Sequence, residues 1–242
     1  MTVRSPNVRK LTWSKPAVLG SRQSPEREAY PYDTERARRP LGLLTKTPYN
    51  YHMDRFKIVD GVYVYFVTFT IIDWLPVFIN PEPTQILMDS MRYCVREKGL
   101  RINAYVIMPN HLHMIVFDRM FDNTRLQQAL ADLRKYTGRR LADYVDDNLP
   151  ETLAKVIHRN DLADRDRQIW QPSWHAEGLL SEHCWKEKLD YIHQNPVRKG
   201  YVRLPEHWRY SSAGYWLKQE VGDVPVVPIQ SEENEEECHG YW

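Results

Sequence analysis

Two short apolar runs separated by only two residues constrain the fold of this chain more than any other feature. Residues 102–108 read INAYVIM and residues 111–117 read HLHMIVF, with Pro109 and Asn110 between them. β-Branched and aromatic side chains favour strands, and Pro-Asn is typical of a tight turn. Because so short a connection joins antiparallel strands, the sequence predicts a β-hairpin here.

The second of these runs carries two histidines on one face. Successive side chains of a strand point to opposite sides, so His111 and His113 share a face, while Leu112 and Met114 share the other. Two titratable rings side by side on an apolar strand fit either two hydrogen-bonded core histidines or two ligands of a metal ion. The spacing alone leaves both interpretations open.

The flanking sequence predicts more strands and helices. VYVYFVTFTII (62–72) is typical of a buried strand, and IWQPSW (169–174) adds a short one. Apolar residues at helical spacing predict helices over 83–99, 123–145 and 181–195. The second starts at an Asn123 or Thr124 cap and the third at Ser181, and Pro196 should end or kink the third at Asn195. This order predicts an α+β sandwich, with an antiparallel sheet covered by helices on one face.

Charge is distributed unevenly along the 242 residues. The first fifty contain ten Lys and Arg against four acids, together with six prolines, whereas no Lys or Arg follows Lys218. We therefore expect a basic, Pro-rich, disordered arm over 1–50, a folded domain over 51–218 and an acidic tail over 219–242. The formal net charge of +1 gives no overall field that would indicate a nucleic-acid partner.

Cysteine usage and hydropathy suggest a compartment. The three cysteines form no C-x-x-C pair, which fits a reducing environment. No window approaches the length of an apolar membrane span, and no apolar segment follows the basic start as in a secretory signal. The expectation is a cytoplasmic protein without a membrane partner.

The helix over 181–195 carries a second group of chemically interesting residues. Spacings of three and four place Lys188, Tyr191 and Asn195 on one face, beside the apolar stripe. A phenol is a poor nucleophile while protonated, but it can attack a phosphodiester when a metal ion polarises the phosphate. Because two imidazoles and an amide are neutral ligands, they would not offset the positive charge of such an ion. Tyr191 is also one of fifteen tyrosines, and an ordinary structural role is the alternative.

Two long motifs resemble a known family. AYVIMPNHLHMIV, followed later by KLDYIHQNPVRKGYV, is similar to the REP-associated tyrosine transposases, a branch of the single-tyrosine HUH endonucleases (His, hydrophobic, His). Further similar stretches are LRKYTGRR, IWQPSWHAEGL and HWRYSSAGYW. The resemblance covers residues 51 to 216 and does not extend to the arm or the tail.

The resemblance implies both a fold and a chemistry. The fold is a ferredoxin-like (RRM-like) palm with the histidine pair on a central strand. His111, His113 and Asn195 become metal ligands, and Tyr191 becomes the nucleophile that takes up a 5′ phosphate and releases a 3′ hydroxyl. The cofactor would be Mg²⁺ or Mn²⁺ with no organic cofactor, although imidazoles also suit Zn²⁺, Ni²⁺ and Cu²⁺. The partner would be single-stranded DNA with REP-like hairpins, bound by a monomer or by a homodimer that exchanges the tyrosine helix.

A nuclease must also neutralise a polyanion. The candidate phosphate contacts are Arg134, Lys135, Arg139, Arg140, Lys188, Arg198 and Lys199; a solvated helix face is the alternative for each. Trp170 or Trp174 could stack a base, although tryptophans are mostly core residues, and His193 should have a packing or hydrogen-bonding role.

Three other functions compete with a nuclease. The first is a catalytically silent regulatory protein that binds hairpin DNA with the same fold. A zinc-supported structural module is the second, but no Cys and His spacing supplies four ligands. A metal-dependent phosphohydrolase is the third, and it would leave the Tyr–Asn pair unexplained.

Overall fold

The computed structural model describes residues 58–158 and 166–229, so the predicted arm over 1–50 and the end of the acidic tail lie outside the described residues. The strands are β1 (Tyr65–Thr70), β2 (Leu100–Met108), β3 (His111–Asp118) and β4 (His175–Gly178). The α-helices are α1 (Pro81–Glu97), α2 (Asn123–Asn148), α3 (Glu151–Ala154), α4 (Glu182–Arg198) and α5 (Ala213–Lys218). Short 3₁₀ turns are η2 (Ile72–Trp74), η3 (Val77–Ile79), η4 (Lys155–Ile157) and η5 (Pro205–His207).

The strands form one antiparallel sheet in the order β2-β3-β1-β4. Along the chain, β1, α1, β2, β3, α2 and β4 follow one another, which is the arrangement of a ferredoxin-like fold. The predicted α+β class is therefore confirmed. The predicted hairpin is present too, with Met108 opposite His111 across the two-residue turn.

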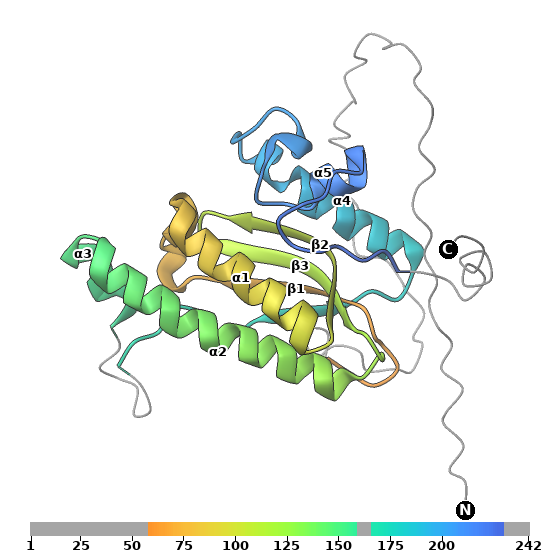
Figure 1. Cartoon of the computed structure of the whole chain (residues 1–242), viewed down its shortest axis with the longest axis horizontal. Coiled ribbons are helices and arrows are strands. Elements are labelled where there is room, and N and C mark those ends of the chain that lie inside the picture. The colour runs from red at the N-terminus through yellow and green to blue at the C-terminus, as the bar shows by residue number, and fades with distance from the viewer. Residues whose placement is uncertain (1–57, 159–165, 230–242) are drawn as a thin grey trace, which may run out of the picture.

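Helices cover both faces of this sheet (Figure 1). One core lies between the sheet and the pair α1 and α2, and it includes Tyr65, Leu112 and Met114. A second core lies between the other face and α4, and it includes Phe66 and Ile115. The expectation of helices on one face only was wrong, because the central strands are apolar on both faces and each face needs cover.

A buried asparagine joins α4 and α5 to the sheet. Asn103 lies at a break in the β2–β3 register, between Ile102 and Ala104, and is completely buried. Its Oδ1 accepts a hydrogen bond from Trp185 Nε1 of α4 (2.7 Å), and its carbonyl oxygen accepts one from Trp216 Nε1 of α5 (2.9 Å). The irregularity in β2 thus provides the polar contacts that hold α4 against the sheet.

Two local predictions differ from the structure. The last strand is His175–Gly178 rather than 169–174, a segment that forms an isolated bridge between Trp170 and Ile71, the residue after β1. Pro172 has no N–H to donate to a ladder, which explains why regular pairing starts after it. The cap of α2 is Asp122, whose side chain accepts from the N–H groups of the first turn, rather than either residue after it.

Helix α4 also continues beyond its predicted end. It begins at the predicted Ser181 cap but runs through Pro196 to Arg198. The final turn closes with hydrogen bonds from Lys199 N to the Asn195 carbonyl and from Tyr201 N to the Pro196 carbonyl. Gly200, at φ 75°, then ends the helix, because glycine adopts a left-handed conformation without steric cost.

The first part of the predicted acidic tail packs on the domain. Val224 and Ile229 are buried, and Val227 N donates to the Ile102 carbonyl on β2. This segment occupies hydrogen-bonding groups at the free edge of β2. Within residues 58–158 and 166–229, the helices are all too short or too polar to span a membrane.

Candidate active site

The two histidines of β3 lie together on the face that α4 partly covers. Both side chains are buried, and their ring centroids are 4.7 Å apart. The register of β1 and β3 places Thr68 opposite His113 and Thr70 opposite His111. Alternation along the strand thus produces the predicted pair, with Leu112 and Met114 in the other core.

One nitrogen of each imidazole is hydrogen bonded to a neighbouring side chain. His111 Nδ1 lies 2.7 Å from Asn110 Oδ1, while Asn110 Nδ2 donates to the Trp74 carbonyl. Because the amide oxygen accepts, His111 Nδ1 carries the proton and Nε2 keeps a lone pair. His113 Nδ1 lies 2.8 Å from Thr68 Oγ1, which leaves its Nε2 for another partner.

Burial keeps both imidazoles neutral near pH 7. Desolvation, with a smaller contribution from Lys199, lowers the pKa of His111 to about 4. Desolvation, followed by the charges of His111 and Lys188, lowers the pKa of His113 to about 3. Neutral imidazole is the form that binds a metal ion, so the pair is in its ligating form at neutral pH.

Tyr191 of α4 lies against this pair in the same chain. Its ring centroid is 5.2 Å from that of His113, in an edge-to-face arrangement. Phe66 of β1 stacks on His113 at 5.2 Å and meets Tyr191 edge-on at 5.9 Å. Tyr191 is nonetheless 38% exposed, so the phenol is positioned by packing and open to solvent.

Three of the predicted cationic residues surround the tyrosine and histidines. Lys188 Nζ lies 4.8 Å from the Phe66 ring centroid and pairs with Glu177 of β4 at 2.7 Å. The Arg198 guanidinium lies 5.6 Å from the Tyr191 ring centroid. Lys199 is close enough to His111 to contribute to its lowered pKa. This side of the site is therefore cationic.

Asn195 and His193 are buried in α4, one turn and half a turn after Tyr191. Asn195 is 5% exposed and follows Tyr191 at the predicted spacing of four residues. His193 Nε2 forms a 2.9 Å hydrogen bond with Ser212 Oγ, in agreement with its predicted structural role. Burial lowers the pKa of His193 to about 4.

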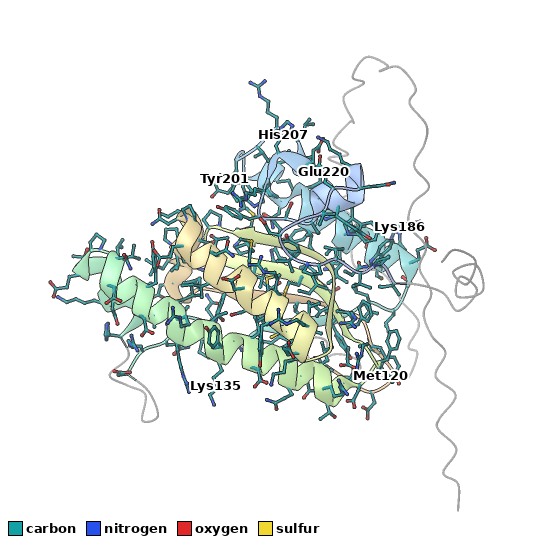
Figure 2. All side chains as sticks on the ribbon, in the orientation of Figure 1. Met120, Lys135, Lys186, Tyr201, His207 and Glu220 are labelled. Atoms are coloured by element: carbon teal, nitrogen blue, oxygen red, sulfur yellow. The ribbon has the colours of Figure 1, made fainter. Side chains whose placement is uncertain are left out.

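The other four predicted cationic residues belong to α2, on the opposite side of the sheet from α4. Arg134 donates to the Gln171 carbonyl at 2.6 Å and lies over the Phe69 ring. Lys135 and Arg139 are exposed and line a cavity between α1 and α2, and Arg140 is exposed as well. Figure 2 shows Lys135 on the outer side of α2, remote from Lys186 on α4. The seven predicted contacts thus form two separate groups.

Of the two candidate stacking tryptophans, Trp170 has a structural role. Its ring is buried, and its Nε1 donates to Thr137 Oγ1 at 3.0 Å. Trp174 packs edge-on against Phe69 at 5.6 Å. These contacts place both rings around Phe69, on the core side that faces α1 and α2.

Sequence reasoning missed several residues that shape the site. They are Phe66, Thr68, Trp74, Asn110 and Glu177. Trp74 is 59% exposed and presents its ring edge-on to His111, with centroids 6.2 Å apart. Asn110 had a signal, since it directly precedes His111. The others are near the pair only because of strand register and order, which a single sequence does not display.

The predicted metal ligands are His111, His113 and Asn195. Two imidazole nitrogens and the Asn195 carboxamide are neutral donors of the kind that hold a metal ion while leaving coordination positions open. Among the described residues, no group of three or more His, Cys, Asp or Glu side chains could hold an ion by itself.

The fold and the site together define a ferredoxin-like domain that presents a histidine pair and a helix-borne tyrosine on one face. No protein-family model matches the chain. Over 128 residues, 53% of this chain, it is 23% identical to the REP-associated tyrosine transposase of Escherichia coli K12. Over 119 residues, 49% of the chain, it is 28% identical to a Haemophilus influenzae Rd protein assigned provisionally to the same family. The matches span 63% and 61% of those two relatives.

A structural comparison gives a weaker likeness. A solved REP-associated tyrosine transposase bound to a REP hairpin aligns with a TM-score of 0.49 and 16% identity, over 77% of this chain and 94% of that one. Over about half of its length, the chain is thus similar in sequence to REP-associated tyrosine transposases.

Proposed function

We propose that this protein is a DNA endonuclease and strand transferase that cleaves single-stranded DNA near hairpins through a covalent 5′-phosphotyrosine intermediate. The observation that carries the proposal is the contact between the Tyr191 and His113 rings within one chain. The two curated relatives, both assigned to the REP-associated tyrosine transposases, support the same reaction class. Transposition, strand transfer and hairpin recognition all belong to the proposal.

The proposed cofactor is Mg²⁺ or Mn²⁺, held by His111, His113 and Asn195. The donor chemistry fits, because both imidazoles are neutral and each has its Nδ1 hydrogen bonded, so that Nε2 is left to bind. When bound, the ion would withdraw electron density from the scissile phosphate. Asn110 and Thr68 are positioning residues, since each holds one ring in its orientation.

The chain's own residues account for the remaining chemistry. The Tyr191 oxygen attacks phosphorus and loses its proton to water, a new tyrosine–phosphate bond forms, and the bond from phosphorus to the 3′ oxygen breaks. The departing oxygen takes up a proton and becomes a 3′ hydroxyl. Because the phosphoester is kept, attack by another 3′ hydroxyl reverses the step and joins strands. Arg198 supplies positive charge beside the Tyr191 ring, and Lys188, paired with Glu177, lies beside the neighbouring Phe66 ring.

The surroundings of the site suit an extended strand. Lys199 and Arg198 are exposed cations that can contact phosphates, and Trp74 provides an exposed aromatic ring beside His111 on which a base can stack. Single-stranded DNA can reach a phenol that is partly open to solvent, whereas a duplex keeps its bases stacked. The proposed substrate is therefore single-stranded DNA next to a hairpin.

Covalent capture tests the proposal directly. Labelled single-stranded hairpin DNA, incubated with the protein and Mn²⁺, should give an SDS-stable adduct that requires the metal. Tyr191→Phe should abolish the adduct, because it removes the attacking oxygen and keeps the ring. Tyr201→Phe is the matched control, since this exposed tyrosine stacks on Trp208 instead, and it should retain the adduct. An adduct that survives Tyr191→Phe would refute the assignment.

The alternative of a silent hairpin-binding regulator has its own outcome. It predicts that the wild-type protein binds the hairpin and gives no adduct with Mg²⁺, Mn²⁺, Zn²⁺ or Ni²⁺. An adduct that forms only with Zn²⁺ would support the nuclease activity but would show that the cofactor is zinc.

A further inference from the structure

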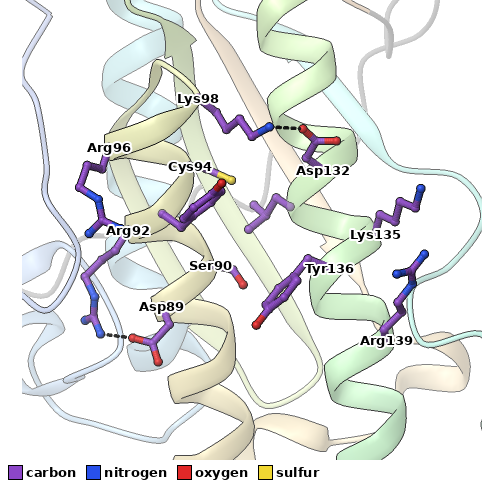
Figure 3. A pocket seen from close by; sticks show the side chains of 12 residues that line it. Asp89, Ser90, Arg92, Cys94, Arg96, Lys98, Asp132, Lys135, Tyr136 and Arg139 are labelled. Carbon is purple, nitrogen blue, oxygen red and sulfur yellow. Dashed lines mark hydrogen bonds and ion pairs between the residues drawn. The ribbon is translucent and has the colours of Figure 1, made fainter.

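A cavity of about 700 Å³ opens between α1 and α2, on the side of the sheet away from Tyr191 (Figure 3). Its floor includes the buried residues Cys94 and Leu133. Exposed side chains from both helices form its walls. We call it the α1–α2 groove.

The groove is cationic. Its charged lining residues are Arg92, Arg96, Lys98, Lys135 and Arg139 against Asp89 and Asp132. The two acids are already paired, Asp89 with Arg92 and Asp132 with Lys98 (Figure 3). Lys135 and Arg139 form no ion pair with another residue of 58–158 or 166–229, although the charge of Lys135 contributes to the lowered pKa of Asp132. Their charge is therefore available to an anionic ligand.

Two tyrosines contribute aromatic surface to this groove, one from each helix. Tyr93 of α1 is 49% exposed and Tyr136 of α2 is 57% exposed. Solvent-exposed aromatic rings beside unpaired cations are the combination that single-stranded nucleic acid uses, with bases on the rings and phosphates on the cations.

A buried hydroxyl also lacks a partner at this place. Ser90 is 5% exposed, and its Oγ is among the buried side-chain atoms without a hydrogen bond in the described structure. Ser90 points from α1 into the space between the helices, toward Tyr136 (Figure 3). An unsatisfied buried polar group costs stability, so its presence in a groove wall points to a ligand that bonds it.

We propose that the α1–α2 groove is a second binding site for single-stranded DNA, separate from the site of cleavage. Bases stack on Tyr93 and Tyr136, phosphates contact Lys135 and Arg139, and the Ser90 hydroxyl bonds the bound strand. The cavity is larger than a phosphate ion. Its two aromatic rings can stack on the bases of a nucleic acid, and they would make less favourable contacts with the acidic side chains of a peptide. We identify this ligand as the single strand that flanks the hairpin, an assignment that rests on the proposed function.

Binding of a fluorescent oligo-dT strand, followed by anisotropy at several salt concentrations, tests the groove. Replacing both tyrosines by serine should weaken binding about tenfold or more, whereas replacing both by phenylalanine should preserve it, because phenylalanine keeps the stacking face. Lys135→Gln with Arg139→Gln should reduce the slope of log affinity against log salt by about 1.4, at about 0.7 per phosphate contact. The exposed Lys155→Gln should leave the slope unchanged.

Ser90→Ala gives a signature that a structural role would not produce. It should weaken oligo-dT binding several-fold while leaving the thermal midpoint unchanged or higher, because it removes an unsatisfied buried hydroxyl. An abasic strand of equal length should bind much more weakly than oligo-dT. Equal affinity for the two strands, or wild-type affinity in the double serine variant, would overturn the proposal.

The groove and the nuclease proposal can fail separately. If the wild-type protein forms the Tyr191 adduct and all groove variants bind oligo-dT normally, only the groove proposal is refuted. If the groove variants lose affinity for oligo-dT and the wild-type protein forms no adduct, only the nuclease proposal is refuted.

Discussion

Each imidazole of the site is oriented by a different neighbour. Asn110, which precedes His111 in the chain, holds it through a carboxamide, whereas Thr68 reaches His113 across the sheet through a hydroxyl. Hydrogen bonds of this kind fix the orientation and tautomer of ligating histidines and contribute to metal affinity. The Thr68 contact is the easier one to test, because valine has nearly the shape of threonine.

We expect Thr68→Val to lower the affinity for Mn²⁺ about 10-fold or more, because His113 loses the bond that orients it. Isothermal titration calorimetry of the purified protein measures this. Thr70→Val is a matched control, since Thr70 lies opposite His111 on the same strand and forms no side-chain hydrogen bond with another described residue. Equal losses in the two variants would show that the Thr68 hydroxyl has no particular role.

A second residue-scale prediction concerns His193 and the pH dependence of stability. Its pKa is about 4 in the folded protein and near the ordinary 6.5 when unfolded, so between these values the unfolded state binds more protons. Stability therefore falls as pH is lowered through this window. We expect His193→Gln to remove on the order of 2 kcal/mol of the loss in unfolding free energy between pH 7 and pH 5. Urea unfolding at both pH values measures it, and an equal loss in both proteins would contradict it.

At the scale of elements, the position of α4 decides whether the site exists. Tyr191 reaches His113 because the apolar face of α4 packs on β2 and β3, with Trp185 and Ile192 in the second core. The buried polar contact of that interface is the hydrogen bond from Trp185 to Asn103, while the ion pair of Lys188 with Glu177 of β4 is partly exposed. We therefore expect the packing of α4 on the sheet to be sensitive to loss of the buried amide.

We expect Asn103→Ala to lower the unfolding free energy by about 2–3 kcal/mol, because it leaves Trp185 Nε1 buried without a partner. Urea denaturation measures this change. Gln127→Ala, on the exposed surface of α2, should change stability by about 0.5 kcal/mol or less. If Asn103→Ala were equally mild, the anchoring argument would be wrong.

The elements also show how far sequence reasoning reaches. The hairpin and the long helices follow from local patterns, and turn chemistry and apolar spacing predicted them. Strand β4 was misplaced, because HAEG has no strand-like composition and pairs with β1 through its backbone. Helix α4 passes through Pro196 because tertiary packing overrides a local preference. The contact of Tyr191 with His113 was expected only from the family resemblance, since packing partners are not encoded in spacing.

At the scale of the whole molecule, the sheet separates two surfaces with different chemistry. One face carries the histidine pair, Tyr191 and the cations of α4, and the other carries the α1–α2 groove. The net charge of +1 conceals this arrangement, because acidic residues gather elsewhere in the chain. The seven predicted cationic residues therefore lie on two surfaces, and a DNA strand long enough to pass around the domain could contact both.

The same whole-molecule geometry makes a prediction about assembly. Tyr191 contacts His113 of its own chain, so one copy contains every residue proposed for cleavage, and exchange of the tyrosine helix is unnecessary. Mixing Tyr191→Phe with a His111→Ala, His113→Ala double variant should therefore give no more hairpin adduct than either protein alone. A helix-swapped dimer would instead restore part of the adduct, because one composite site would combine intact histidines with an intact tyrosine. The control is wild-type protein diluted into each variant. An amount of adduct that rises with the concentration of the mixed variants would contradict cleavage within one chain.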